Sequence, residues 1–209
     1  LGIGLSHQVV VESLWGLSYD RPLRYMREYL AALTPLLEGE QVAATGEVVS
    51  AMGAVEVAAP RPELLVAALG PRMLELAGRV TDGTVTWMVG PKTLADHIVP
   101  TIDRAASDAD RPAPQVAVSL PVCVTDHPDG ARERASAEFL MYGTLPSYRA
   151  MMDREGVAGP EDLAIIGGAD QVAERLDGIA AAGATTFAAS EFGNLDELAA
   201  TRDLLVSLR

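Results

Sequence analysis

The sequence predicts an α/β fold in which helices cover a mainly parallel sheet. Two observations support this: short apolar segments alternate with amphipathic segments along the chain, and each short segment is apolar throughout rather than at every second residue. Continuous apolar strands are typical of parallel sheets, because helices cover both of their faces. No linker, repeat or block of charge divides residues 1–209, so we expect a single domain.

The predicted strands are runs of apolar and β-branched residues bounded by turn residues. Residues 116–124 form the longest run, and its β-branched side chains are typical of strands. Residues 40–60 look irregular, with a small hairpin expected over residues 48–57. The main sheet is expected to hold about five strands, formed by residues 1–5, 64–69, 84–89, 116–124 and 185–189.

Helices are predicted where apolar residues recur every three or four positions. Asp20 and Asp170 are expected to cap two of them, and Asn194 with Glu197 resembles a capping box for the last. Pro35 should kink the first helix or separate its last turn. The predicted helices cover residues 22–37, 72–80, 91–109 with an interruption near Pro100, 128–155, 170–182, and the residues after Asn194.

Two architectures fit this alternation, an open doubly wound sheet and a (β/α) barrel. A closed (β/α)8 barrel typically needs about 250 residues, so the barrel requires roughly three further βα units before residue 1. The chain opens with the apolar run Leu1-Gly2-Ile3-Gly4, which we interpret as a strand already in progress. We therefore expect a partial barrel, the C-terminal portion of a longer protein.

The composition argues against several classes of function. Sixteen Lys and Arg against 29 Asp and Glu give a net charge of −13, which repels nucleic acids and anionic membranes, so neither is an expected partner. Cys123 is the single cysteine, and the three histidines lack metal-ligand spacing, so we expect neither a disulfide nor a metal site. No apolar run reaches membrane-spanning length and no signal peptide is recognisable, which favours a cytoplasmic protein.

A first candidate site lies at the end of the first predicted strand. Gly4 there would let the backbone approach a ligand closely. His7 could donate a proton or a hydrogen bond to a substrate, since the active site of a barrel lies at the C-terminal ends of its strands. A tight βα turn, with a histidine that only bonds loop backbone, is the alternative interpretation. The segment does not match the dinucleotide fingerprint, because His7 stands where the third glycine is required.

A second candidate site is the strand-to-helix passage Leu69-Gly70-Pro71-Arg72-Met73. Free N–H groups and the helix dipole at such a passage favour an anion. Arg72 adds a guanidinium that can bind phosphate with two N–H groups. We favour a phosphate site here over an ordinary turn with a surface arginine.

Other residues that could carry chemistry are given structural roles. Trp87, Tyr142 and Tyr148 are interpreted as packing residues, the alternative being contacts to a ring or a substrate entrance. Cys123 is interpreted as a buried apolar filler. His97 and His127 have no acidic or cysteine partner in the sequence, and no role is assigned to them.

Several segments resemble one known family in their order and spacing. They are residues 1–7, 19–22, 25–37, 62–83 with the sequence PELLVAALGPRMLELAGRVTDG, 84–87, and 168–183. Together they resemble luciferase-like flavin-dependent monooxygenases and their deazaflavin-dependent relatives, above all the oxidoreductases that depend on coenzyme F-420 (F420). The resemblance runs through nearly the whole chain, and no single motif decides it.

The resemblance implies a (β/α)8 TIM barrel of the bacterial-luciferase-like type, with the cofactor at the C-terminal strand ends. The first strand here is similar to the family's fourth, so this chain would lack about the first three βα units. Hydride would pass between a bound deazaflavin and a small organic substrate, and His7 would be the catalytic residue facing that substrate. The implied cofactor-binding residues are Gly4, Leu5 and Ser6 near the ring system, and Leu69, Gly70, Pro71, Arg72 and Met73 at the phosphate.

Three alternatives remain open. FMN could replace F420, which would make the protein a luciferase-like monooxygenase, or the partial barrel could bind a flavin without turnover. A doubly wound nucleotide-binding domain ranks lowest, because no helix follows the Gly-x-Gly strand promptly. In some sugar-phosphate-oxidising relatives a carboxylate stands at the position of His7, so that substrate class is not carried over. The apolar helices and the resemblance also suggest a homodimer.

Overall fold

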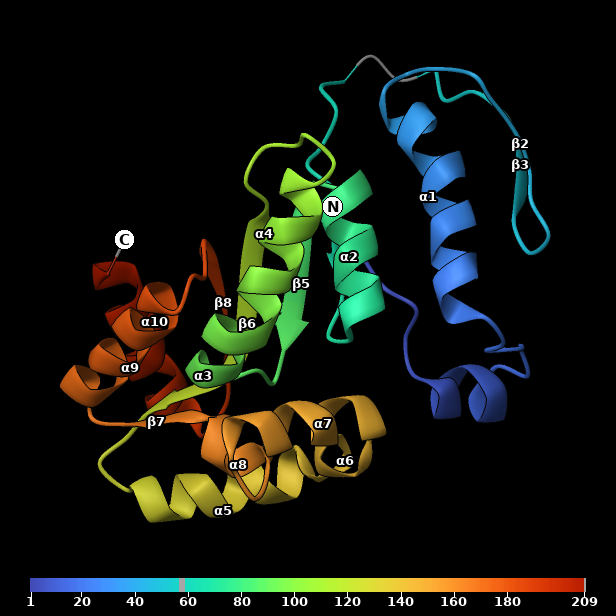
Figure 1. Ribbon diagram of the computed structural model, residues 1–209. Coiled ribbons are helices and arrows are strands. Elements are labelled where there is room, and N and C mark those ends of the chain that lie inside the picture. The colour runs from blue at the N-terminus through green and yellow to red at the C-terminus, as the bar shows by residue number, and fades with distance from the viewer. Residues whose placement is uncertain (57–58, 209) are drawn as a thin grey trace.

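The computed structural model describes residues 1–56 and 59–208 of the chain (Figure 1). A six-stranded sheet forms its centre, and a two-stranded hairpin lies apart from it. The strands of the central sheet are β1 (Gly2–Ile3), β4 (Leu65–Ala67), β5 (Gly83–Trp87), β6 (Gln115–Val124), β7 (Ile165–Gly167) and β8 (Thr186–Glu191), and those of the hairpin are β2 (Val42–Thr45) and β3 (Ser50–Gly53).

Every strand pairing in the central sheet is parallel, as the sequence predicts. The strands follow the order β1-β4-β5-β6, and β6 is long enough to pair with both β7 and β8. Val122 pairs with Ile165 on one side and Glu191 on the other, so β7 and β8 lie on opposite edges of β6. Because all strands run the same way, the segments that follow them emerge at one end of the sheet.

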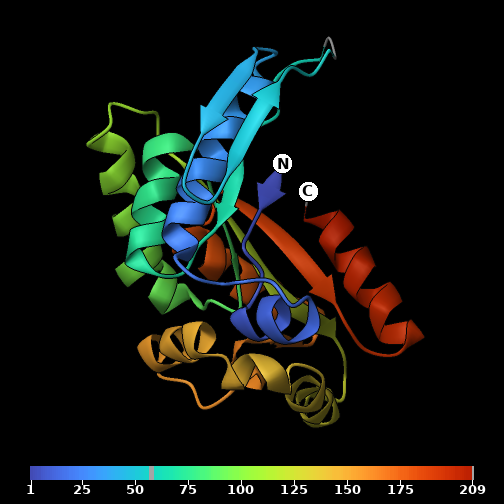
Figure 2. The ribbon, with the colours of Figure 1, turned by 90° about the vertical axis from the view of Figure 1, so that its right-hand side faces the viewer.

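Helices alternate with the strands and cover one face of the sheet (Figures 1 and 2). The other face is less covered, since Ala67 and Ala188 are exposed and β8 has no fully buried residue. The prediction of strands buried on both faces therefore holds for β6 but not for β8. The helices are α1 (Pro22–Leu37), α2 (Pro71–Val80), α3 (Pro91–Thr93), α4 (Val99–Ser107), α5 (Pro128–Glu138), α6 (Leu140–Thr144), α7 (Pro146–Glu155), α8 (Pro160–Leu163), α9 (Ala169–Ala181) and α10 (Leu195–Ser207), with π-helical turns η1 (Val10–Leu14) and η2 (Leu94–Ile98).

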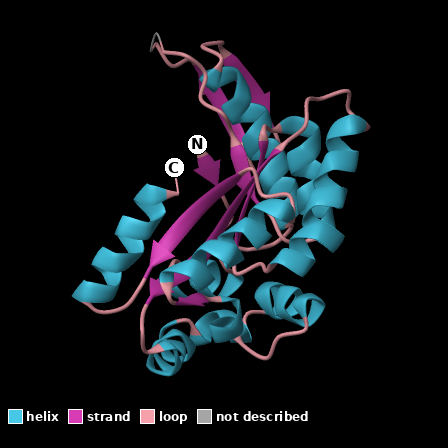
Figure 3. Cartoon of the chain, turned by 90° about the vertical axis from the view of Figure 1, so that its left-hand side faces the viewer, coloured by secondary structure: helices cyan, strands magenta, loops and turns pink. Residues whose placement is uncertain are grey.

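Helices α5 to α8 form a layer across the end of the sheet toward which the strand arrows point (Figure 1). This layer contributes buried side chains, among them Tyr148 and Met152, to the same apolar core that contains Val66 and Val118. Figure 3 shows the layer below the sheet and the hairpin at the opposite end. The loops after β1, β4 and β5 therefore face a helical cover rather than open solvent alone.

Three helix boundaries differ from the prediction. Arg21 in the left-handed conformation, with φ of 53°, precedes α1, while Asp20 instead accepts a hydrogen bond from the hydroxyl of Ser18 at 2.9 Å. Pro35 does not split off the last turn of α1, which ends only two residues later at Leu37, so the missing N–H removes a single bond from that turn. Gly168 rather than Asp170 precedes α9, because the Gln171 side chain already accepts the Gly168 N–H at 3.1 Å.

The hairpin lies earlier in the chain than the predicted residues 48–57. Glu28 on α1 accepts hydrogen bonds from the backbone N–H groups of Val48 and Val49, at 2.8 and 2.9 Å, and these bonds hold that segment as the turn of the hairpin. The predicted end of the hairpin at Val57 lies outside the described residues. Residues 91–109 are interrupted at η2, just before Pro100, and residues 128–155 divide into three helices.

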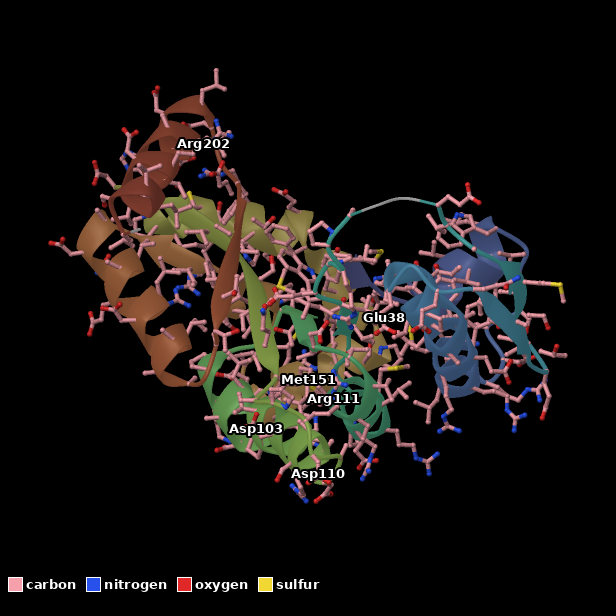
Figure 4. The ribbon with its side chains drawn as sticks, turned by 90° about the horizontal axis from the view of Figure 1, so that it is seen from above. Glu38, Asp103, Asp110, Arg111, Met151 and Arg202 are labelled. Atoms are coloured by element: carbon pink, nitrogen blue, oxygen red, sulfur yellow. The ribbon has the colours of Figure 1, made fainter. Side chains whose placement is uncertain are left out.

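The capping box at Asn194 is confirmed. Its side-chain oxygen accepts the N–H groups of Asp196 and Glu197 at 3.0 Å each, and Glu197 Oε2 accepts the Asn194 N–H at 2.8 Å. On the same helix, Arg202 points toward β8 (Figure 4), where its Nε donates to Glu191 at 2.6 Å. The capping box thus fixes the start of α10, and Arg202 anchors the helix to the sheet.

Candidate functional site

The ends of β1 and β4 bring two distant segments together. Because these strands are parallel neighbours, with Gly2 beside Leu65, the chain leaves both at the same end of the sheet. A cavity of about 310 Å³ lies there. Its lining includes most of the residues predicted from the sequence, namely Gly4, Leu5, Ser6, His7, Leu69, Gly70 and Met73.

The backbone around Gly4 and Ser6 shapes the first side of the cavity. A Cβ at Gly4 would lie 3.0 Å from the Cβ of Ala67, so glycine allows the chain after β1 to pass close beside β4. Ser6 has a φ of 60°, a left-handed conformation that turns the chain toward His7. Tyr19 Oη donates to the Ser6 carbonyl at 3.2 Å, and burial raises the pKa of this phenol.

Gly70 forms the second side as the N-cap of α2. Its backbone is extended, and a Cβ built there would meet no atom within 4 Å, so the bend faces open space. The Gly70 carbonyl accepts the N–H groups of Met73 and Leu74 at 3.1 Å. The N–H groups of Gly70 and Arg72 have no acceptor among the residues that the structure describes. They remain available at the positive end of the helix dipole.

Pro71 and Arg72 were predicted with this bend but do not line the cavity. Pro71 occupies the first position of α2, where its missing N–H removes no helical hydrogen bond. The Arg72 side chain is exposed and makes no ion pair or hydrogen bond within residues 1–56 and 59–208. It stands beside the bend and remains a predicted anion ligand.

His7 faces an aromatic wall formed by the helical cover. Its ring centroid lies 5.6 Å from that of Tyr148 and 6.4 Å from that of Tyr142. Trp87 on β5 continues the wall, at 5.6 Å from Tyr142. The His7 ring makes no hydrogen bond to any described residue, so it does not serve to hold the loop backbone. Its nitrogens are free to meet a ligand.

Trp87 and Tyr148 pack in the core, as predicted, and also face the cavity. Both line the cavity, and burial together with the neighbouring Tyr142 raises the pKa of Tyr148 to about 12, so its hydroxyl keeps its proton at neutral pH. Trp87 Nε1 and Thr86 Oγ1, on adjacent cavity-lining residues of β5, are buried and lack a partner in the described part of the chain. The sequence does not indicate that Trp87 and Tyr148 share one wall of a cavity, because α6 and α7 complete that wall only in the folded chain.

Two further cavities adjoin the first. One of about 460 Å³ extends along Val11, Trp15 and Tyr25, and another of about 520 Å³ extends toward Leu145. Ser6 and Tyr19 border all three. An elongated ligand could thus extend from the Gly70 bend past His7.

His97 contacts the backbone of the bend from outside the cavity, and no sequence pattern marks it. It is 8% exposed on η2, and its Nε2 lies 2.8 Å from the carbonyl oxygen of Leu69.

No group of three or more His, Cys, Asp or Glu residues with metal-binding geometry occurs in the described ranges. Within those same ranges no helix has both the length and the apolar character needed to span a bilayer.

Comparisons with known proteins point to one family. The model of the family described as luciferase-like monooxygenase matches residues 1–186. A 5,10-methylenetetrahydromethanopterin reductase from Methanolobus tindarius is 31% identical over 171 residues, which cover 81% of this chain and 52% of the reductase. An F420-dependent glucose-6-phosphate dehydrogenase from Beutenbergia cavernae is 34% identical over 140 residues, covering 63% of this chain and 41% of that enzyme.

Solved structures share the fold. An F420-dependent secondary alcohol dehydrogenase, in complex with an F420–acetone adduct, superposes with a TM-score of 0.77 at 17% identity, over 100% of this chain and 69% of that one. The chain spans about half the length of the curated relatives it matches. The parallel sheet, its helical cover and the matched residues confirm the predicted α/β fold as part of a luciferase-like TIM barrel. This chain belongs to the luciferase-like monooxygenase family.

Proposed function

We propose that this chain forms part of an F420-dependent oxidoreductase that transfers hydride between a bound deazaflavin and a small organic substrate. The observation that carries the proposal is the cavity shared by the Gly70 bend and His7 at the carboxyl ends of parallel strands. Ligands of barrel enzymes bind at that end. The names of two relatives include F420, which favours the deazaflavin.

The residues present fit one side of such a cofactor. The bend offers free N–H groups at a helix N-terminus and an adjacent free guanidinium, which suit a phosphate. Gly4, Leu5 and Ser6 offer backbone and an apolar side chain along the adjoining cavities, where a flat ring can lie. A bound deazaflavin would supply the carbon that accepts or gives up hydride, which no side chain can do.

The chain's own residues would bind, orient and move a proton. Gly70 and Arg72 would hold the anion, while Leu5 and Ser6 would set the position of the ring. The aromatic wall of Tyr148 and Trp87 would keep water from the substrate side. His7 would hold the substrate or exchange a proton with it through a ring nitrogen.

A direct test is to titrate the 209-residue chain with F420 and, separately, with FMN, following ligand fluorescence. We expect saturable binding of F420 that is tighter than that of FMN. Binding of FMN alone would replace the deazaflavin by the flavin of the alternative hypothesis. Binding of neither would overturn the proposed cofactor site.

Catalysis is tested separately from binding. Reduced F420 is mixed with the chain and a panel of small ketones, aldehydes and imines, and reoxidation is followed by absorbance. Enzyme-dependent reoxidation with at least one compound is expected. Tight binding without any reoxidation would favour the non-catalytic flavin-binding barrel instead.

A further inference from the structure

His97 lies behind the Gly70 bend, on the side away from the cavity. The η2 turn that carries it follows β5, and its neighbours Leu94 and Ile98 are completely buried. His97 lines none of the cavities at the site, whereas Leu69 and Gly70 line the central one. The imidazole and the cavity therefore lie on opposite sides of the same stretch of backbone.

The contact between His97 and Leu69 determines which imidazole nitrogen carries the hydrogen and how the Leu69–Gly70 peptide is oriented. A carbonyl oxygen can only accept a hydrogen bond, so the 2.8 Å contact requires that Nε2 carry the hydrogen. In a trans peptide the C=O and N–H groups point in opposite directions. With the Leu69 carbonyl held toward His97, the Gly70 N–H points away from His97.

Other contacts keep the imidazole at this position. Glu155 of α7 accepts the N–H groups of Lys92 and Thr93, at 3.1 and 2.7 Å, where α3 begins. The π-helical turn then brings His97 against Leu69, and such turns are frequent at functional sites. Because α7 also carries Tyr148, one helix fixes both the aromatic wall and the segment that bears His97.

We propose that His97 is a positioning residue which, by holding the Leu69 carbonyl, directs the Gly70 N–H toward the phosphate of the cofactor. The inference rests on the proposed function and adds a residue to its phosphate site. The Gly70 N–H is a free donor among the described residues, and a Cβ built at Gly70 would meet no atom within 4 Å, so the bend is open. Without the imidazole, the Leu69–Gly70 peptide could rotate and the donor would lose its direction.

The test compares ligands that carry the phosphate with ligands that lack it. Dissociation constants are measured for FMN against riboflavin, and for F420 against the deazaflavin alcohol that lacks its phosphate, with wild type, His97→Leu and His97→Gln. We expect His97→Leu to weaken the phosphate-bearing ligand about tenfold and to leave its phosphate-free partner nearly unchanged. His97→Gln keeps an N–H donor and should recover most of the preference.

The outcomes separate this inference from the proposed function. If wild type binds neither phosphate-bearing ligand, the proposed function fails. If wild type binds but His97→Leu weakens both members of a pair equally, His97 is only structural and the inference is overturned. Wild type alone gives a second measurement if His97→Leu does not fold: the Gly70 amide NMR signal should shift with FMN and not with riboflavin, and an unmoved signal also overturns the inference.

Discussion

Arg72 and Gly70 lie at one bend but would bind an anion in different ways. Arg72 contributes a mobile charge from an exposed side chain, whereas Gly70 contributes a fixed N–H and the absence of a Cβ. A charge-assisted hydrogen bond is worth about 1.5–3 kcal/mol, more than a neutral one. The two contributions can therefore be separated by substitution.

The Arg72→Ala variant should bind F420 at least about tenfold more weakly, because it loses a charge-assisted hydrogen bond to the phosphate. Fluorescence titration measures the change. Arg79→Ala is the matched control, since Arg79 lies on the same helix but at its far end, where it pairs with Asp108 at 3.6 Å. Equal weakening in both variants would show a general effect of charge and remove Arg72 from the site.

The Gly70→Ala variant should fold normally and bind the cofactor more weakly. Its backbone conformation, with φ of −79°, suits alanine, and the added methyl group meets no protein atom within 4 Å. The methyl group would instead occupy the space in which we place the phosphate. Calorimetry gives the affinity and thermal unfolding gives the stability. Gly178→Ala, another open position but on α9, is the control and should leave binding unchanged.

The His7→Ala variant should keep its cofactor affinity and lose turnover. General acid–base catalysis contributes about 100-fold or more to the rate, so kcat with a substrate from the reoxidation panel should fall by at least that factor. His127→Ala is the control, because His127 is exposed and lies before α5, outside the lining of the three cavities. An unchanged kcat in His7→Ala would contradict the catalytic role.

At the scale of elements, Glu197 connects three parts of the fold. From α10 it accepts the hydroxyl of Thr125, which follows β6, at 2.8 Å, and both of its oxygens lie 2.7 Å from Arg134 Nη2 on α5. Burial alone raises the pKa of Glu197, but the bonds from the Asn194 N–H, Thr125 and Arg134 outweigh burial and lower that pKa below its ordinary 4.5.

This shift predicts acid sensitivity with a definite sign. Because the folded-state pKa lies below the unfolded one, the stabilisation is fully present above pH 4.5 and is lost as pH falls through the lowered value. Glu197→Gln should lower the free energy of unfolding by about 1–3 kcal/mol at pH 7. Its difference from wild type should shrink in acid, as measured by urea unfolding. A difference independent of pH would contradict this, and Glu174→Gln, an exposed position, is the control.

The sequence could predict elements whose signal is local. The strand at residues 116–124 is confirmed within one residue as β6, because a long β-branched run has few alternatives. The strand β7 was missed, since its three residues Ile165–Gly167 are too few to show a period and depend on pairing with β6. The N-cap of α1 was wrongly predicted at Asp20, because the Asp20 carboxylate instead accepts a hydrogen bond from the Ser18 hydroxyl.

At the candidate site, too, the sequence could predict some residues and not those whose positions depend on tertiary packing. Gly4, His7 and Gly70 were placed together correctly, because parallel strands release their ends at one end of the sheet. Tyr148 and His97 could not be placed. Their positions depend on how α7 and η2 pack against the sheet, and a lone tyrosine or histidine in a helix carries no record of that packing.

At the scale of the whole molecule, the central sheet has two unpaired edges among the described strands. The strand β1 pairs only with β4, and β8 pairs only with β6. Apolar side chains are exposed near the second edge, including Leu208 after α10 at 50%. Unpaired edges and exposed apolar patches favour association between chains. We therefore expect the 209-residue chain, studied by itself, to self-associate through these edges.

Sedimentation velocity over a range of protein concentrations should show a reversible increase in size. Ala188→Lys places a charge on an exposed residue of the edge strand β8, and charges on edge strands oppose pairing with another chain, so this variant should be smaller than wild type at equal concentration. Ala199→Lys, on an exposed position of α10, is the control and should associate like wild type. A wild-type chain that stays monomeric at every concentration would show that other features of the fold protect these edges.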